Sequence, residues 1–165
     1  MNGNKTARYS IAVFDEWSSL LSAIRSIVKL QRRHDDITIL GRSEAFADPA
    51  LTGLTKKLGE KVDRCFSECF ELAFVQQNPK LTCTKGPFAA HLTVAASEGH
   101  VSLREALKLW MPEIHADRIN EDLKQACLHL WCQVFEPESE QKISLALLDM
   151  RPLRVELRDL RLIPV

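Results

Sequence analysis

Two short apolar runs near opposite ends of the chain limit what it can fold into. Tyr9–Phe14 and His129–Phe135 have the length of β-strands and show no helical period. In each run both alternating sets of residues are largely apolar, so a strand formed there has an apolar surface on both faces. Such strands are expected in the middle of a sheet that is covered on both sides.

Each run opens a strand–helix–strand pattern. After the first run, Asp15 can cap a helix, and Ile37–Leu40 follows as a second strand. After the second run, Pro137 marks a helix start and Pro152 ends the helix. The buried face of the first helix is predicted to carry Trp17, Leu20, Leu21, Ile24, Ile27 and Val28. The last strand is indicated by apolar residues that alternate with charged ones: Leu153, Val155 and Leu157.

The two patterns also share letters, which suggests an internal repeat. A shift of 121 residues places Val13-Phe14-Asp15 on Val134-Phe135-Glu136, and Ile24 and Ile27 on Leu145 and Leu148. Two β-α-β units in one small domain predict an α+β fold, the ferredoxin-like split β-α-β sandwich. In that fold the first strand of each unit is central in an antiparallel sheet, and both helices lie on one face.

The 165 residues are expected to form one domain, with a first unit at 9–41, an insertion at 42–127 and a second unit at 128–162. The insertion is predicted to be helical. Its helix signals are Asp48-Pro49, a one-sided apolar pattern over Glu60–Val75, the capping box Ser102-Leu-Arg-Glu105 before Leu103–Met111, and Glu113–Ala126. Residues 86–97 are apolar and rich in small residues, and give no clear prediction. The inserted helices or a second subunit should cover the second face of the sheet.

Composition and charge exclude several classes of protein. Lysine plus arginine and aspartate plus glutamate both number 22, which argues against a generic polyanion binder. No apolar run approaches the ~18 residues of a membrane helix. The apolar run before Asp15-Glu16 is shorter than the ~7–15 residues of a secretion signal. We therefore expect a cytoplasmic protein with five reduced thiols: Cys65, Cys69, Cys83, Cys127 and Cys132.

The cysteines and histidines offer few metal-binding patterns. Cys65 and Cys69 lie four residues apart, so on a helix they share a face and could bind a metal together with Cys83 or a histidine. Both also fall on the apolar stripe, and core packing is the favoured interpretation. Four histidines are scattered along the chain without the spacing of a metal site: His91, His100, His115 and His129. We expect no metal and no cofactor.

Two charged clusters have a functional and a structural interpretation. His34-Asp35-Asp36 after Arg32-Arg33 could transfer protons, or form a solvated turn, which is favoured. Arg25, Lys29, Arg32 and Arg33 could bind phosphates, but no RNP1-type run accompanies them, and nucleic-acid binding is not expected. Motifs of common nucleophilic and nucleotide-binding enzymes are absent as well.

Several stretches resemble a known family. Ile11-Ala-Val-Phe-Asp15 and Ile37-Thr-Ile-Leu-Gly41 resemble the opening of a bacterial family of unknown function related to general stress proteins. Met111–Leu123 and Leu130-Trp-Cys-Gln-Val134 are similar to that family's later helix and third strand. The resemblance covers roughly half of the chain and implies the fold and a stress-response context, but no site residue. The family's glycine- and alanine-rich hairpin, which suggests membrane contact, has only residues 86–97 as a counterpart here.

Two functions follow as hypotheses. The first is a non-enzymatic stress-associated or regulatory protein that acts through protein contacts, including self-association, because the second sheet face is apolar. The alternative is a small-ligand-binding protein or an enzyme, with an apolar pocket between the sheet and the insertion. The lining expected for that pocket is Trp131, Phe135, Trp110 and His115.

Overall fold

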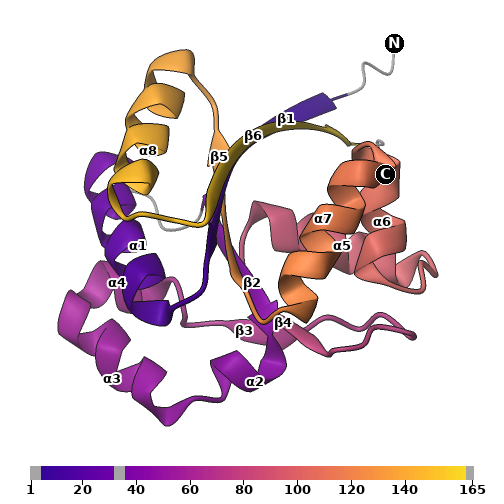
Figure 1. Cartoon of the computed structure of the whole chain (residues 1–165), viewed down its shortest axis with the longest axis horizontal. Helices are drawn as coiled ribbons and strands as arrows, with labels where there is room; N and C mark the ends of the chain where they lie inside the picture. The colour runs from indigo at the N-terminus through magenta and orange to yellow at the C-terminus, as the bar shows by residue number, and fades with distance from the viewer. Residues whose placement is uncertain (1–4, 32–35, 163–165) are drawn as a thin grey trace.

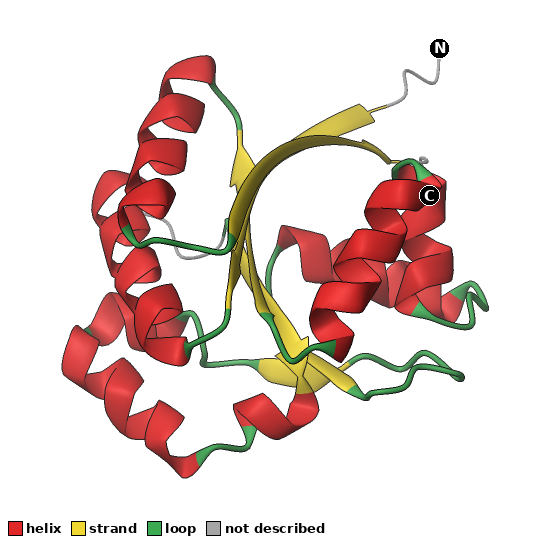
Figure 2. Ribbon diagram, in the orientation of Figure 1, coloured by secondary structure: helices red, strands yellow, loops and turns green. Residues whose placement is uncertain are grey.

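The chain folds as an α+β protein with an antiparallel sheet between two groups of helices (Figures 1 and 2). The computed structural model describes residues 5–31 and 36–162. The strands are β1 (Lys5–Phe14), β2 (Ile37–Arg42), β3 (Cys69–Glu71), β4 (Leu81–Thr84), β5 (Leu128–Val134) and β6 (Arg154–Leu162). The described helices are α1 (Trp17–Gln31), α2 (Ser43–Phe46), α3 (Pro49–Leu58), α4 (Glu60–Arg64), α5 (Pro87–Ser97), α6 (Leu103–Trp110), α7 (Glu113–Lys124) and α8 (Pro137–Asp149).

The six strands lie in the order β3-β4-β2-β5-β1-β6, and every neighbouring pair is antiparallel. β1 runs between β5 and β6, so that Ile11 lies opposite both Trp131 and Glu156. β5 in turn lies between β1 and β2. The two strands that are apolar on both faces therefore have neighbours on both sides, as their side chains require.

One face of the sheet is covered by α1 and α8, with α3 and α4 beside α1 (Figure 1). The core on this face joins strand residues such as Ala12 and Leu130 to helix residues such as Ile24 and Ile143, all fully buried. The apolar stripe predicted on α1 is the buried stripe of the helix. Trp17, at its start, is partly buried against the same core.

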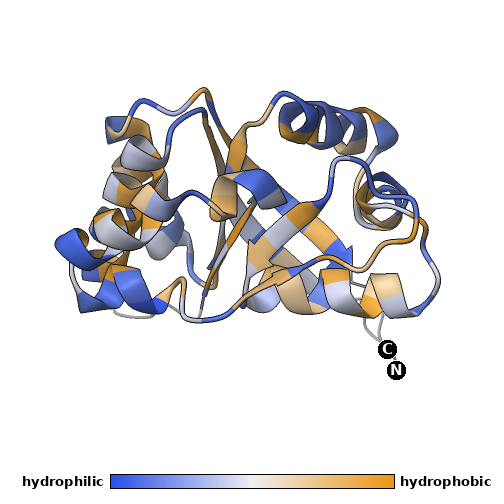
Figure 3. Cartoon of the chain, turned by 90° about the horizontal axis from the view of Figure 1, so that it is seen from below, coloured by the Kyte–Doolittle hydropathy of each residue, from blue (hydrophilic) through white to orange (hydrophobic). Residues whose placement is uncertain are grey.

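The other face is covered by α5, α6 and α7 (Figure 1). Tyr9, Ile11 and Trp131 lie beneath them with Phe88 and Leu107, and all five side chains are buried. Figure 3 shows the apolar strands in the middle of the molecule, with helices on both sides. The inserted segment, and not a second subunit, thus covers the second sheet face.

The insertion is not wholly helical, because it adds β3 and β4 to the sheet. The prediction of one helix over Glu60–Val75 is wrong: α4 ends at Arg64, and an extended segment follows. Phe70, Leu72 and Phe74 repeat every second residue, and Leu72 and Phe74 are the fully buried members. Phe70 and Phe74 also fit the predicted helical stripe, which does not include Leu72, and the pairing of β3 with β4 selects the strand.

Local helix signals are confirmed where a polar residue caps a helix. The Asp48 carboxylate accepts a hydrogen bond from the Ala50 amide at the start of α3, at 2.9 Å. The Ser102 hydroxyl accepts one from the Glu105 amide at the start of α6, at 3.3 Å. Residues 86–97, which gave no clear prediction, contribute α5.

The internal repeat is not supported by burial. Ile24 and Ile27 are fully buried, whereas their supposed counterparts Leu145 and Leu148 are 57% and 54% exposed. The buried residues of α8 are Ile143 and Leu147 instead. Within residues 5–31 and 36–162, no helix combines the length and apolar character that crossing a membrane requires.

Candidate functional site

A surface groove lies where the inserted helices meet the short edge of the sheet, and we call it the α5 groove. Its cavity volume is about 860 Å³. The walls come from the end of α4, the loop before β3, the turn between β4 and α5, and the first turns of α5. The lining residues are Arg64, Cys65, Ser67, Glu68, Phe70, Lys85, Gly86, Pro87, Ala89, Ala90 and Thr93.

The floor of the groove depends on Gly86, the residue before α5. A Cβ atom at this position would lie 2.2 Å from the Thr38 hydroxyl oxygen and 2.5 Å from the Ile37 carbonyl oxygen. Only glycine lets the turn approach β2 this closely. Pro87 then occupies the first turn of α5, where its missing N–H leaves no helix hydrogen bond unmade.

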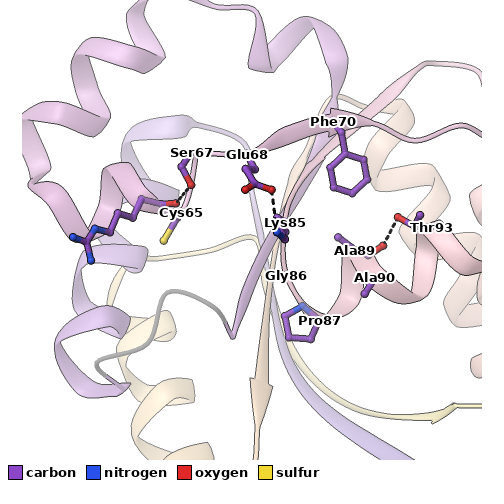
Figure 4. Close-up of a pocket in the computed structure, with 11 residues that line it drawn as sticks. Cys65, Ser67, Glu68, Phe70, Lys85, Gly86, Pro87, Ala89, Ala90 and Thr93 are labelled. Atoms are coloured by element: carbon purple, nitrogen blue, oxygen red, sulfur yellow. Dashed lines mark hydrogen bonds and ion pairs between the residues drawn. The ribbon is translucent and has the colours of Figure 1, made fainter.

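Most polar side chains of the groove are engaged with one another or with nearby backbone (Figure 4). Arg64 pairs instead with Glu60 of α4, at 2.6 Å. Lys85 Nζ lies 3.2 Å from Glu68 Oε2, in the middle of the groove. The hydroxyl of Ser67 donates to the Arg64 carbonyl at 2.9 Å, and that of Thr93 donates to the Ala89 carbonyl at 2.9 Å. The groove therefore combines the Glu68–Lys85 ion pair and the Arg64 cation with an apolar wall.

That wall lies toward one end of the groove, around Phe70. The Phe70 side chain is 36% exposed, and Ala89 and Ala90 line the same end from α5 (Figure 4). Alanines at these positions leave space where longer side chains would fill it. An aromatic ring beside two alanines suits a flat apolar group of a ligand.

The pocket predicted around Trp131 is filled by another aromatic residue. Phe88 stacks on Trp131, with ring centroids 3.7 Å apart, and lies 6.4 Å from Trp110. Trp131 and Trp110 are both buried in this core, whereas Phe135 is 66% exposed after β5. His115 lies instead beside Arg158, with the His115 Nδ1 atom 2.8 Å from Arg158 Nη2. The four predicted lining residues do not converge on one cavity.

The cysteine pair does not share a helix face, so that part of the metal hypothesis is wrong. Cys65 is buried where α4 ends, and Cys69 is exposed on β3. Cys83 lies in β4, where burial, followed by the proximity of Cys69, raises the pKa of its thiol to about 12. In the part of the chain that the structure describes, no three side chains of His, Cys, Asp or Glu are placed to hold a metal ion.

Four of the five histidines lie in the described residues, in α5, the loop before α6, α7 and β5. His129 is fully buried, and its Nε2 lies 3.1 Å from the Asp122 carboxylate, which Arg154 also contacts at 2.5 Å. Burial by itself raises the pKa of Asp122, but the hydrogen bonds with His129 and Arg154 outweigh it and leave the pKa below its usual value. This group stabilises the contact of α7 with β5 and β6.

The charged clusters of the sequence fall partly outside the described residues. Arg32, Arg33, His34 and Asp35 lie there, so the favoured interpretation as a solvated turn and the expectation of no nucleic-acid binding both stay predictions. Arg25 and Lys29 are exposed on α1. Asp36 is buried, and its carbonyl accepts a hydrogen bond from the Gln133 amide at 3.0 Å.

The α5 groove was missed because its walls come from segments about 20 residues apart in a part of the chain that was expected to be helical. One local signal was present in the stretch that gave no clear prediction. Gly86-Pro87 marks a turn into a helix. The alanines that follow, Ala89 and Ala90, give the start of that helix small side chains. Comparisons with models of protein families, with curated proteins and with solved structures find no match to this chain.

Proposed function

We propose that this chain binds a small, largely apolar organic molecule in the α5 groove. The observation that carries the proposal is the groove itself, with about 860 Å³ of space beside Phe70 and two alanines. Small-molecule sites typically enclose about 300–1,000 Å³ and are lined mainly by apolar groups with a few polar ones. The ion pair of Glu68 and Lys85 supplies the polar contribution here.

The groove favours binding over catalysis. Its carboxylate, Glu68, forms an ion pair with Lys85 at 3.2 Å, and its second cation, Arg64, is paired with Glu60. The hydroxyls of Ser67 and Thr93 donate to backbone carbonyls, so neither is held by a general base as a nucleophile would be. We therefore propose a regulatory role in which occupancy of the groove is the signal.

A neutral apolar fluorophore, N-phenyl-1-naphthylamine, tests the proposal. Ala90 is an exposed groove residue, so Ala90→Trp fills the groove without disturbing the core. We expect the wild-type chain to bind the probe with a 1:1 stoichiometry, and Ala90→Trp to weaken binding at least ~10-fold, the effect of losing about 1.4 kcal/mol.

The matched control is Ala50→Trp, which makes the same change at an exposed alanine of α3 outside the groove. This variant should bind the probe as the wild type does. Probe binding that is absent from the wild type, or equal in the wild type and Ala90→Trp, would contradict the proposal. Circular dichroism spectra of all three proteins establish that they are folded.

We also propose the finer fold assignment, a ferredoxin-like sandwich. The order β6-β1-β5-β2 within the sheet and the position of α1 and α8 on one face support it. The family of stress-related proteins, and with it a stress-associated context, is a proposal that depends on sequence resemblance alone, at Ile11–Asp15, Ile37–Gly41, Met111–Leu123 and Leu130–Val134.

A further inference from the structure

The lining of the α5 groove carries a net positive charge. Its charged side chains are two cations, Arg64 and Lys85, and one carboxylate, Glu68, so the formal charge of the lining is +1. Arg64 is paired with Glu60 of α4, which is not part of the lining. Lys85 and Glu68 are therefore the charges that a molecule in the middle of the groove contacts (Figure 4).

The ion pair of Lys85 and Glu68 is open to solvent. The backbone N–H of Lys85 donates to the Glu68 carbonyl at 3.0 Å, which holds the two residues opposite each other at the end of the β3–β4 pair. Their side chains are nevertheless 73% and 63% exposed. Ion pairs this exposed contribute only about 0–1 kcal/mol to stability. An anionic group of a ligand can therefore replace the Glu68 carboxylate beside Lys85 at little cost.

The start of α5, directly after Lys85, adds hydrogen-bond donors. Gly86 is the N-cap of this helix and has no side chain to accept hydrogen bonds from the amides of the first turn. The Thr38 hydroxyl is fully buried and has no hydrogen-bond partner, and it lies against Gly86, where a Cβ atom would be 2.2 Å from its oxygen. Uncapped amides and the positive end of the helix dipole both favour an anion here.

The apolar end of the groove selects the rest of the ligand. Figure 4 shows Phe70 to one side of the Glu68–Lys85 pair, and Ala89 and Ala90 line the same end. A ligand with its apolar body at Phe70 therefore has its polar group close to Lys85. A second negative charge on the ligand would be repelled by Glu68, so a single charge fits best.

We propose that the ligand of the α5 groove is an organic acid with an apolar body and one anionic group. The body lies beside Phe70 and the two alanines of α5. The anionic group binds Lys85 at the start of α5 and displaces Glu68 from it. This inference rests on the proposed function, the binding of an apolar molecule in the same groove, and adds the charge of that molecule.

Two fluorescent probes with the same apolar body test the charge. N-phenyl-1-naphthylamine is neutral, and 8-anilinonaphthalene-1-sulfonate is the same molecule with one sulfonate added. We expect the wild-type chain to bind the sulfonate probe more tightly than the neutral one. Lys85→Gln should reduce the ratio of the two affinities at least ~5-fold, the effect of losing about 1 kcal/mol. Glu68→Gln should raise this ratio, because it removes the competing carboxylate.

The matched control for Lys85→Gln is Lys142→Gln. Lys142 of α8 also forms an exposed ion pair, with its Nζ atom 3.2 Å from Glu138 Oε1, but it does not line the groove. This variant should bind both probes as the wild type does. Circular dichroism spectra of the variants establish that they are folded.

The possible failures of the two proposals can be told apart. If neither probe binds the wild type, or if Ala90→Trp leaves the binding of both unchanged, the groove is not a ligand site and both proposals are wrong. Binding of the neutral probe that Ala90→Trp weakens would support the proposed function. If the sulfonate probe then binds no more tightly than the neutral one, or if Lys85→Gln leaves the ratio of affinities unchanged, only the inference of an organic acid is overturned.

Discussion

A single methyl group at Gly86 has no room in the turn before α5. In Gly86→Ala the new Cβ would lie 2.5 Å from the Ile37 carbonyl oxygen, a backbone atom that cannot move without shifting β2. We expect Gly86→Ala to lower the free energy of unfolding by about 1–3 kcal/mol, as overpacking does in a close-packed interior. Urea denaturation followed by tryptophan fluorescence measures the change.

The control for this substitution is Gly53→Ala. Gly53 lies inside α3, and a Cβ there would meet nothing within 4 Å. Alanine favours the helix over glycine by about 0.5–1 kcal/mol, so this variant should be slightly more stable than the wild type. If Gly86→Ala were as stable as Gly53→Ala, the close approach of the turn to β2 would be wrong.

At the scale of elements, α6 depends on two caps from different parts of the chain. Ser102 accepts a hydrogen bond from the Glu105 amide, and the Gln77 side chain accepts one from the Leu103 amide at 2.9 Å. Ser102→Ala should cost about 1 kcal/mol of stability, because the Glu105 amide loses its partner.

Thermal or urea unfolding checks this prediction, with Ser102→Asp as the matched variant. Aspartate also caps helix starts, so Ser102→Asp should retain most of the wild-type stability. Equal losses in Ser102→Ala and Ser102→Asp would show that the hydroxyl does not act as a cap.

The elements differ in how far the sequence could predict them. The caps at Asp48 and Ser102 act within a few residues, and both were correctly predicted. The hairpin of β3 and β4 was missed, because Phe70 and Phe74 also fall on a helical stripe with Val62 and Phe66, and the alternation with Leu72 was not used. What selects the strand is the pairing of Phe70 with Cys83, a contact that no local pattern contains.

At the scale of the whole molecule, β1 and β5 are apolar on both faces, and this pattern correctly predicted that both sides of the sheet are covered by other segments. The sequence left open which segment would cover the second face, and it did not indicate that Phe88 would stack on Trp131, where a pocket was predicted. The α5 groove could not be predicted, since it depends on which side chains remain exposed after distant elements have packed.

The acid stability of the whole chain should depend on Asp122, which joins α7 to β5 and β6. Its pKa is below the ordinary value in the folded chain, so its contribution to stability is complete above about pH 4 and is lost as the pH falls through the lower folded-state pKa. Asp122→Asn should be about 1–3 kcal/mol less stable at pH 7. The difference in the free energy of unfolding between Asp122→Asn and the wild type should become smaller as the pH falls below 4.

Urea midpoints at pH 7, 5, 4 and 3 measure this dependence for the wild type and the variant. Glu71→Gln, a change at an exposed carboxylate of β3, serves as the control and should show no deficit at pH 7. A deficit of Asp122→Asn that stays constant from pH 7 to pH 3 would mean that the carboxylate charge does not stabilise the contact.

The position of β1 in the sheet also determines when the protein can fold during its synthesis. β1 leaves the ribosome first, yet its two partners, β5 and β6, are the last strands to be made. Until they emerge, a nascent chain can pair only β2, β4 and β3 with one another. β1 therefore has no sheet partner until β5 has been synthesised, and its apolar residues stay exposed to other chains in the meantime.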